Sequence, residues 1–414
     1  MAEAQAAVQS TAPRAVFSQR PFRTLWVAQF ISIFGDFLAL FGVISLITFR
    51  LHGGARDVTT AVVAATLPLA LIAPFAGVFA DRWPAKRVLV ASDLLRAALA
   101  TSLVFARDVQ QIAFVLAGIS IVSSFFAPAQ SIALRRLVAK EQLLSANALL
   151  AQAFFAVRIL SPAVAGGLVS WLGERACFWV DGASFVFSAV LLGSLALSRT
   201  LAPKETTLRS LANDFAEGNR FIFTHRGLTF AFCAIGVAML VLSSFSPLIS
   251  IYVRDQLHGG PLAYGLVSSM VGVGLIVGSA LAARAAGRRA APSVIVPGLF
   301  GVGAGAALLG AIPHPIGAAA GTFTLGLSIA FVMVPGQTLS QTETPHELMG
   351  RVSSTFMSLF SFSQVLGLLM SGALAERLGV RNLFFAAACA MAVLATGARL
   401  WMGARKTVVT AAQT

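Results

Sequence analysis

The sequence contains very little charge for its length. Only 11% of the 414 residues are Asp, Glu, Lys or Arg, whereas 57% are hydrophobic and the mean hydropathy is +0.84. Soluble proteins carry about 25% charged residues, and a soluble chain of this size could not cover its surface with so few. The composition therefore excludes an ordinary soluble fold and predicts an integral membrane protein.

Acidic residues are the scarcer of the two charge types. The chain has 16 Asp and Glu against 30 Lys and Arg, which gives a formal net charge of +14. In a polar chain such an excess would indicate a nucleic-acid partner. Here most basic residues fall between apolar runs, which is the topology signal of a protein with many membrane spans. We therefore expect no nucleic-acid partner.

Cysteine and histidine are also rare. Cys177, Cys233 and Cys389 lie in apolar runs without CxxC spacing, which is typical of buried small hydrophobic residues. The five histidines all fall outside the predicted spans, at His52, His225, His258, His314 and His346. No Ser/His/Asp, HExxH or DxD-like set lies at membrane depth. The sequence thus predicts no metal site, no cofactor and no enzymatic activity.

Long apolar runs are abundant. A helix needs about 20 apolar residues to cross the hydrocarbon layer, and twelve runs of that length occur in two sets of six. The first set covers residues 24–49, 59–80, 87–107, 110–132, 148–172 and 177–198; the second covers 228–251, 262–284, 292–312, 316–338, 353–375 and 380–402. The sequence therefore predicts an all-α membrane protein with twelve transmembrane helices in two six-helix bundles.

The polar segments complete the expected domain organisation. Residues 1–23 and 403–414 are predicted cytoplasmic tails, and residues 199–227 are a cytoplasmic linker between the bundles at 24–198 and 228–402. Within the linker, Leu208, Leu211 and Phe215 recur at helical spacing. This pattern indicates an amphipathic helix on the membrane surface.

The basic residues predict the orientation in the membrane. With a cytoplasmic N-terminus, 21 of the 30 basic residues fall in inner segments, seven in outer segments, and Arg96 and Arg158 within spans. Basic loops remain on the cytoplasmic side. We expect a multi-pass protein of the bacterial plasma (inner) membrane with both termini in the cytoplasm.

The two halves of the sequence resemble each other. The run Phe-Ala-Pro128-Ala-Gln near the end of the fourth span is similar to Val-Pro335-Gly-Gln near the end of the tenth, and the two prolines are 207 residues apart. A short polar connector and a Ser/Gly-rich span follow each proline. Repeated six-helix bundles are typical of transporters with a substrate site at mid-membrane.

The connector between the second and third spans carries a glycine, an acidic residue and three basic ones, namely Gly77, Asp81, Arg82, Lys86 and Arg87. This run resembles the loop signature of the major facilitator superfamily, roughly G-x-L-A-D-R-x-G-R-R/K. It departs from the signature at Pro84 and Ala85, which replace Gly and Arg. The resemblance implies a gating role for Asp81 and Arg82. Alternatively, Lys86 and Arg87 only anchor the loop to anionic lipid.

The fifth span carries a second motif, made of Ser161, Pro162, Gly166 and Gly167. It is similar to the Gly-Pro…Gly motif of the superfamily's antiporters, with Ser161 in place of the glycine. Further runs at 125–129, 143–147, 350–352 and 375–380 resemble the branch of macrolide-efflux proteins and the enterobactin exporter. Residues 28–36 also resemble a bacterial lysophospholipid transporter of the superfamily.

These resemblances imply a secondary active transporter. The expected function is proton-coupled export of a small amphipathic compound (a drug, a siderophore or a similar metabolite) by alternating access. A lipid or lysophospholipid flippase of the same superfamily is the alternative, and a membrane-embedded enzyme or scaffold is a third. The expected partners are a small-molecule or lipid substrate, protons and membrane lipids, and the expected state is a monomer.

Charged residues inside spans are the leading candidates for function, because charge at the membrane centre costs at least about 2.5–3.5 kcal/mol. Asp36 is either a proton-coupling or cation-binding carboxylate, or the structural partner of an arginine. Arg158 is its expected partner, because the first and fifth helices are close in the superfamily fold. Asp93 and Arg96 stand three residues apart, which favours a local ion pair, whereas Asp181 is interpreted as structural.

Neutral polar residues are candidates for lining a cavity or for joining helices by hydrogen bonds. They lie in or beside the fourth, fifth, tenth and eleventh spans, at Gln130, Asn147, Gln152, Gln337 and Gln364. Glycine is concentrated at residues 272–278 and 301–305, where it is expected to let helices approach closely.

Overall fold

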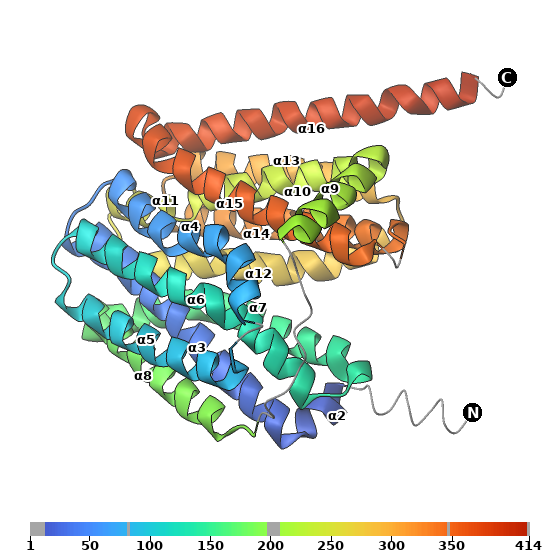
Figure 1. Ribbon diagram of the computed structural model, residues 1–414. Coiled ribbons are helices and arrows are strands. Elements are labelled where there is room, and N and C mark those ends of the chain that lie inside the picture. The colour runs from blue at the N-terminus through green and yellow to red at the C-terminus, as the bar shows by residue number, and fades with distance from the viewer. Residues whose placement is uncertain (1–12, 81–82, 197–207, 346–347, 412–414) are drawn as a thin grey trace. The chain divides into compact units, whose positions relative to one another are not determined.

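Twelve helices in the described part of the chain are long and apolar enough to cross a membrane. A computed structural model describes residues 13–80, 83–196, 208–345 and 348–411, and every regular element in those ranges is helical (Figure 1). In the first half the long helices are α3 (Arg20–Ser45), α4 (Ala55–Ala80), α5 (Ala85–Ser102), α6 (Val109–Leu137), α7 (Leu143–Leu172) and α8 (Glu174–Ser194). In the second half they are α10 (Arg226–Phe245), α12 (Pro261–Ala286), α13 (Ala291–Ala311), α14 (Pro315–Glu343), α15 (Met349–Leu378) and α16 (Val380–Ala411). The protein is therefore an all-α membrane protein with twelve transmembrane helices in two six-helix bundles.

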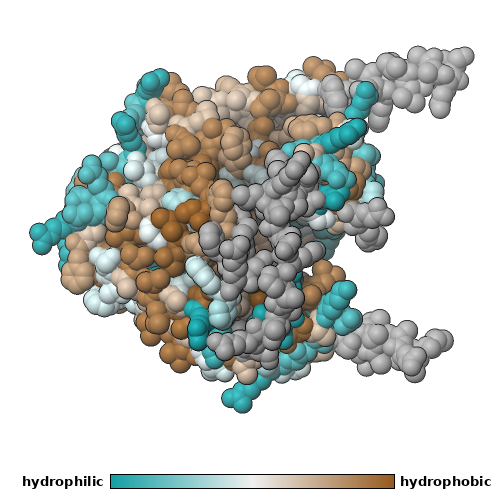
Figure 2. All heavy atoms as spheres, in the orientation of Figure 1, coloured by the Kyte–Doolittle hydropathy of each residue, from teal (hydrophilic) through white to brown (hydrophobic). Residues whose placement is uncertain are grey.

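The chain divides into two compact units. The N-terminal unit comprises residues 1–53 and 60–207, and the C-terminal unit comprises residues 54–59 and 208–414. The boundary thus falls near the start of α4, and the first residues of this helix group with the second unit. Hydrophobic side chains form much of the described surface on the face shown in Figure 2. Side chains as large as Phe114 and Trp171 are 83% and 89% exposed, which is what a lipid-facing surface requires.

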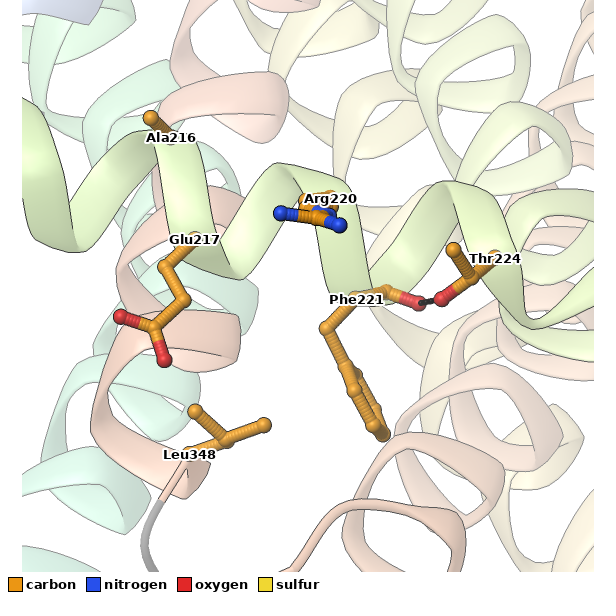
Figure 3. A pocket seen from close by; sticks show the side chains of 6 residues that line it. All are labelled: Ala216, Glu217, Arg220, Phe221, Thr224 and Leu348. Carbon is orange, nitrogen blue, oxygen red and sulfur yellow. Dashed lines mark hydrogen bonds between the residues drawn. The ribbon is translucent and has the colours of Figure 1, made fainter.

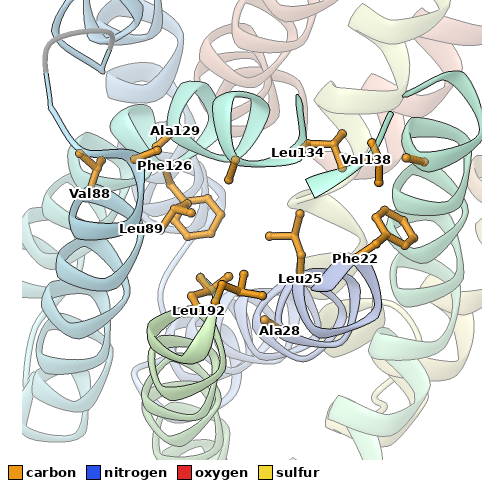
Figure 4. Close-up of a cluster of buried hydrophobic side chains, with 14 of the residues drawn as sticks. Phe22, Leu25, Ala28, Val88, Leu89, Phe126, Ala129, Leu134, Val138 and Leu192 are labelled. Atoms are coloured by element: carbon orange, nitrogen blue, oxygen red, sulfur yellow. The ribbon is translucent and has the colours of Figure 1, made fainter. Parts of the chain in front are cut away.

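In the N-terminal unit, α8 packs against both α3 and α5, while α7 packs against α3 and α6 against α5 (Figure 1). A hydrophobic cluster joins these helices, and Figure 4 shows Leu25 of α3, Leu89 of α5, Phe126 of α6 and Leu192 of α8 within it. Each of these four side chains is at most 5% exposed. The cluster also receives side chains from the short helix α2 (Pro13–Ser18).

Glycine gives the C-terminal unit its closest helix contacts. A Cβ on Gly274 of α12 would collide with the Phe323 carbonyl of α14, and one on Gly326 of α14 would collide with the Val271 carbonyl of α12. A Cβ on Gly305 of α13 would lie 2.9 Å from the Gly321 carbonyl of α14. The predicted role of the glycine-rich runs is therefore confirmed at these helices, where backbones touch without an intervening side chain.

The internal repeat extends to helix ends and turns. Helices α14 and α15 begin and end 206 residues after α6 and α7, respectively. Gly173 and Gly379 end α7 and α15 with the same φ of 79°. Pro128 and Pro335 lie inside α6 and α14 and are 207 residues apart, so the prolines are offset by one residue from the helix ends. The predicted repeat is confirmed.

The first and seventh spans are each modified near their ends. The first ends in a π-helical turn, η1 (Leu46–Arg50). The seventh was predicted as one run over residues 228–251, but α10 ends at Phe245 and a separate helix, α11 (Leu248–Asp255), follows. The seventh span is present, but its predicted end was wrong, because Pro247 lacks an N–H and favours a helix break at the residues before it.

The predicted helix of the linker is present as α9 (Leu208–Thr224). Its described part contacts α15, where Glu217 and Arg351 form an ion pair of 2.6 Å and Ile222 packs against Val352. An open groove of about 610 Å³ lies beside it, and Figure 3 shows Phe221 and Leu348 among its lining residues. One face of α9 is thus covered by protein. The side chains of Leu208, Leu211 and Phe215 lie outside the described residues.

Candidate functional site: a charged cluster at membrane depth

Three carboxylates surround one guanidinium inside the N-terminal unit. Asp36 lies on α3, Asp93 and Arg96 lie on α5, and Asp181 lies on α8. Asp93, Arg96 and Asp181 are 0%, 4% and 1% exposed, respectively. With all groups ionised, the four side chains carry a formal charge of −2. We refer to these four residues as the charged cluster.

Arg96 is the centre of the charged cluster. It forms the expected (i, i+3) ion pair with Asp93, and its Nη1 lies 3.9 Å from Oδ2 of Asp36. The rings of Phe126 and Phe185 each lie 4.4 Å from its guanidinium carbon. Ion pairing and cation–π contact together offset the cost of burying this cation. One Asp93 oxygen, Oδ2, has no hydrogen-bond partner in the described structure.

Asp181 is held against the residue that precedes Asp36. Its Oδ1 lies 2.6 Å from the position that a Cβ on Gly35 would occupy, and Ser184 of the same helix also touches that position. The Ser184 hydroxyl donates a 2.8 Å hydrogen bond to the Asp181 carbonyl. Gly35 therefore lets α8 bring a third carboxylate next to Asp36.

Asp36 is the accessible member of the charged cluster. Its side chain is 40% exposed, whereas those of Asp93 and Arg96 are 0% and 5% exposed. Protein atoms therefore cover Asp36 less completely than the other two residues. The Asp36 and Asp93 carboxylates therefore differ in how much of each is exposed.

Arg158 does not pair with Asp36 as the sequence analysis expected. Asp36 pairs instead with Arg96 of α5, and the described part of the chain offers Arg158 no ion pair. Helix α3 does pack against α7, as expected, but α3 and α5 both pack against α8, and it is Arg96 of α5 that lies beside Asp36. Arg158 is an exposed residue on α7.

The fifth-span motif lies in an uninterrupted α7. Pro162 is inside the helix, and the Ser161 hydroxyl donates a 2.6 Å hydrogen bond to the Val157 carbonyl one turn earlier. Gly166 is buried, whereas a Cβ on Gly167 would meet nothing within 4 Å. The two glycines therefore differ in their surroundings, although they are adjacent in the sequence.

The neutral polar candidates are distributed over α6, α7, α14 and α15. Gln130 and Gln364 are half-buried, and Asn147, Gln152 and Gln337 are exposed. The Asn147 amide donates a hydrogen bond to the Leu143 carbonyl of its own helix. None of the hydrogen bonds described for these five residues reaches the charged cluster. A cavity-lining role stays a prediction for them.

Of the predicted gating loop, Asp81 and Arg82 lie outside the described residues. Gly77 belongs to α4, and Lys86 and Arg87 stand in the first turn of α5, half-buried and exposed respectively. Among the described residues, no group of three or more His, Cys, Asp or Glu side chains could hold a metal ion. Cys177 is buried, and Cys233 and Cys389 are exposed.

Asp181 was interpreted as a structural residue, and its place in the charged cluster was not predicted from the sequence. The structure buries it beside Gly35, the residue before Asp36. The available signal was glycine: Gly35 precedes Asp36 and Gly182 follows Asp181, and both pack closely against neighbouring helices. Small residues beside intramembrane acids indicate that the helices meet at those acids.

Twelve apolar helices, an internal repeat and buried charges at membrane depth define a multi-pass membrane protein of the transporter type. The sequence matches the profile of the Major Facilitator Superfamily over residues 25–367 and 231–412. The chain belongs to this superfamily, and it is a transporter of the inner membrane.

Relatives and solved structures agree with this assignment. The chain is 27% identical over 393 residues to the MFS-type transporter YfiS of Bacillus subtilis, covering 91% of this chain and 92% of the relative. It is 24% identical over 376 residues to Macrolide efflux protein A of Streptococcus pyogenes, with coverages of 88% and 91%. The crystal structure of the nucleoside transporter NupG has a TM-score of 0.71 at 14% identity and covers 92% of this chain and 98% of that one. The last similarity shows the shared fold.

Proposed function

We propose that the protein is a secondary active exporter that moves a small amphipathic compound out of the cell in exchange for protons. The observation that carries this proposal is the accessible carboxylate of Asp36 within a cluster of three carboxylates and one guanidinium. The similarity to Macrolide efflux protein A supports export as the direction.

The composition of the charged cluster supports proton exchange. Like charges at short range in a poorly solvated site oppose one another, so a proton on one carboxylate lowers the repulsion within the cluster. Asp36 is the residue that exchanges this proton, because its side chain is accessible and the others are covered. Arg96 stabilises the site when Asp36 is ionised.

Transport proceeds by alternating access in this proposal: the site with Asp36 opens in turn to each side of the membrane. The bias of basic residues supports cytoplasmic termini, and Lys86 and Arg87 at the start of α5 suit contact with anionic lipid. A single chain is the proposed unit of transport, because all residues of the charged cluster come from one chain.

Everted membrane vesicles test the proposal. Energised vesicles that contain the wild-type protein are expected to accumulate fluorescent amphipathic dyes, and collapse of the proton gradient is expected to stop this. Asp36→Asn is expected to abolish proton-driven accumulation while the protein remains in the membrane. Glu141→Gln, which changes an exposed carboxylate in the connector η3 (Lys140–Gln142), is the control and is expected to keep the wild-type rate.

Two outcomes would contradict the proposal. An unchanged rate in the Asp36→Asn variant would remove the coupling role of Asp36. Translocation of labelled lysophospholipid in proteoliposomes, together with no accumulation of any dye, would favour the lipid flippase instead.

A further inference from the structure

Arg158 stands at the middle of a long membrane helix. Fifteen residues of α7 precede it and fourteen follow it, so each end of the helix is about 22 Å away at 1.5 Å per residue. An arginine side chain cannot reach the membrane surface over that distance. The position therefore differs from that of a basic residue near a helix end, which extends to the headgroups.

The two intramembrane arginines have opposite environments. Arg96 is 4% exposed and is enclosed by carboxylates and aromatic rings. Arg158 is exposed, and no ion pair or hydrogen bond of its side chain occurs among the described residues. An unpaired guanidinium that faced lipid at this depth would cost several kcal/mol. A position facing water, and any compound that enters from water, would avoid this cost.

Helix register places Asp36 and Arg158 at similar positions along α3 and α7. Gln19 bonds to Gln142 at 2.8 Å, and Trp26 donates a 3.0 Å hydrogen bond to the Leu149 carbonyl, so α3 and α7 run parallel with a register of 123 residues there. Further along, Phe37 contacts Phe154, which is a register of 117. Along the helix axes Arg158 thus lies level with residues 35–41 of α3, and Asp36 is offset from it by at most about a turn and a half.

An aromatic surface adjoins these two charges. Phe154 and Phe155 stand one turn before Arg158 on α7 and are 38% and 50% exposed. Their rings contact each other, and Phe154 also contacts Phe37, the residue after Asp36, with 5.8 Å between centroids in both pairs. Residues three and four apart share a helix face, so Arg158 stands on the same face of α7 as this aromatic pair.

We propose that α3 and α7 form a binding site for an amphipathic zwitterion with an aromatic or similarly apolar body. Arg158 binds its acidic group, Asp36 binds its ammonium group, and Phe37, Phe154 and Phe155 contact its body. The inference rests on the proposed export function and names its substrate class. Because the ammonium group and the proton use the same Asp36 carboxylate, binding of one excludes the other, as an exchanger requires.

Three fluorescent probes on one scaffold test this site. Nε-dansyl-lysine carries both charged groups, dansylcadaverine is the same molecule without the carboxylate, and Nα-acetyl-Nε-dansyl-lysine lacks the ammonium charge. Binding is measured by dansyl fluorescence on the purified full-length protein in a neutral detergent. The zwitterion is expected to bind about tenfold or more tightly than either singly charged probe, because each charged hydrogen bond contributes about that factor.

Substitutions assign each charge to its residue. Arg158→Gln is expected to reduce zwitterion affinity about tenfold, to the level of dansylcadaverine, without changing the affinity for dansylcadaverine itself. Asp36→Asn is expected to reduce zwitterion affinity to the level of the acetylated probe. Arg158→Lys retains the charge and is expected to retain part of the preference. Arg107→Gln, at an exposed connector residue, is the control and is expected to leave all three affinities unchanged.

Equal binding of the zwitterion and dansylcadaverine by the wild-type protein would overturn the inference, as would an unchanged preference in Arg158→Gln. Everted vesicles separate this result from the export proposal: binding that depends on Arg158 without proton-driven accumulation contradicts export but not the site. A zwitterionic lysophospholipid that displaces Nε-dansyl-lysine in the wild type and not in Arg158→Gln would identify the compound as a lipid. Displacement only by water-soluble amino-acid conjugates would identify it as a soluble metabolite.

Discussion

Asp181 and Gly35 are in direct contact, and this contact shapes the charged cluster. Oδ1 of Asp181 lies 2.6 Å from where a Cβ on Gly35 would stand. The next residue of α8 is Gly182, and a Cβ there would collide with the Thr101 hydroxyl of α5. The helix that carries Asp181 thus fits between α3 and α5 because glycine occurs at both contacts. The two glycines therefore determine both how closely α8 packs against its neighbours and where the Asp181 carboxylate lies.

The first prediction concerns Gly35. Gly35→Ala is expected to destabilise the protein by about 1–3 kcal/mol, because the added methyl group meets buried polar atoms that cannot move freely. It is also expected to separate Asp181 from Asp36 and to slow transport. The midpoint of thermal unfolding in detergent and the rate of dye accumulation in vesicles measure the two effects.

Gly167→Ala is the matched control for this substitution. A Cβ on Gly167 meets nothing within 4 Å, and alanine favours a helix over glycine by about 1 kcal/mol. The control is expected to be neutral or slightly stabilising. If both variants had the same unfolding midpoint, close packing at Gly35 would be unimportant for stability.

The second prediction concerns the buried ion pair of Arg96 and Asp93. Arg96→Met is expected to cost about 3–5 kcal/mol, because it leaves the fully buried Asp93 carboxylate without its counter-charge. The double variant Arg96→Met/Asp93→Leu removes both charges and is expected to recover most of that loss. Unfolding midpoints of the single and double variants measure the coupling, and simple additivity of the two substitutions would disprove it.

The fold could be predicted from the sequence more completely than the charged cluster. Span positions follow from hydropathy, because each membrane helix must cover about 20 apolar residues whatever its neighbours are. The partner of Asp36 depends on which helices touch, and hydropathy carries no such information. Arg158 and Arg96 both lie at membrane depth, and α3 and α7 are in contact, so the choice between them depends on where each side chain lies and not on helix contacts alone.

Local chemistry explains the remaining differences. The break in the seventh span at Pro247 could have been predicted from the proline itself, since the run of apolar residues continues across it. The burial of Asp181 could have been predicted only by considering Gly35 and Gly182 together, and these glycines lie on two helices far apart in the sequence. Depth along a helix can be predicted from a count of residues, whereas the direction of a side chain requires its neighbours.

The third prediction concerns the attachment of α9. A Cβ on Gly218 would lie 2.7 Å from the Arg351 carbonyl and 2.8 Å from Oγ1 of Thr355. Gly218→Ala is therefore expected to weaken the contact of α9 with α15 by about 1–3 kcal/mol. Hydrogen exchange at the amides of α9 is expected to speed up accordingly, with little change in α12–α14.

Two comparisons show whether this effect is specific. Gly350→Ala, where a Cβ meets nothing within 4 Å, is expected to leave exchange in α9 unchanged. Glu217→Gln breaks an ion pair whose side chains are 53% and 35% exposed, and is expected to cost at most about 1 kcal/mol. A larger effect of Glu217→Gln than of Gly218→Ala would show that charge, and not close packing, holds α9.

The fourth prediction uses the internal repeat. His52 and His258 are 206 residues apart and adopt φ angles of 53° and 49°, which is the left-handed region. Equivalent i→i−5 hydrogen bonds precede them, from Leu51 to the Leu46 carbonyl and from Leu257 to the Tyr252 carbonyl. Both turns therefore impose the same backbone geometry on a residue with a side chain, at a cost of about 1–2 kcal/mol.

Substitution at these histidines is expected to act identically in the two halves. His52→Gly and His258→Gly are expected to be neutral or to stabilise by up to about 1 kcal/mol, because glycine adopts this geometry without strain. His52→Val and His258→Val are expected to destabilise by about 1–2 kcal/mol, since a β-branched side chain tolerates it poorly. Unfolding midpoints of the four variants measure the effect. Opposite signs at the two positions would show that surrounding contacts, and not the repeated turn, determine the stability there.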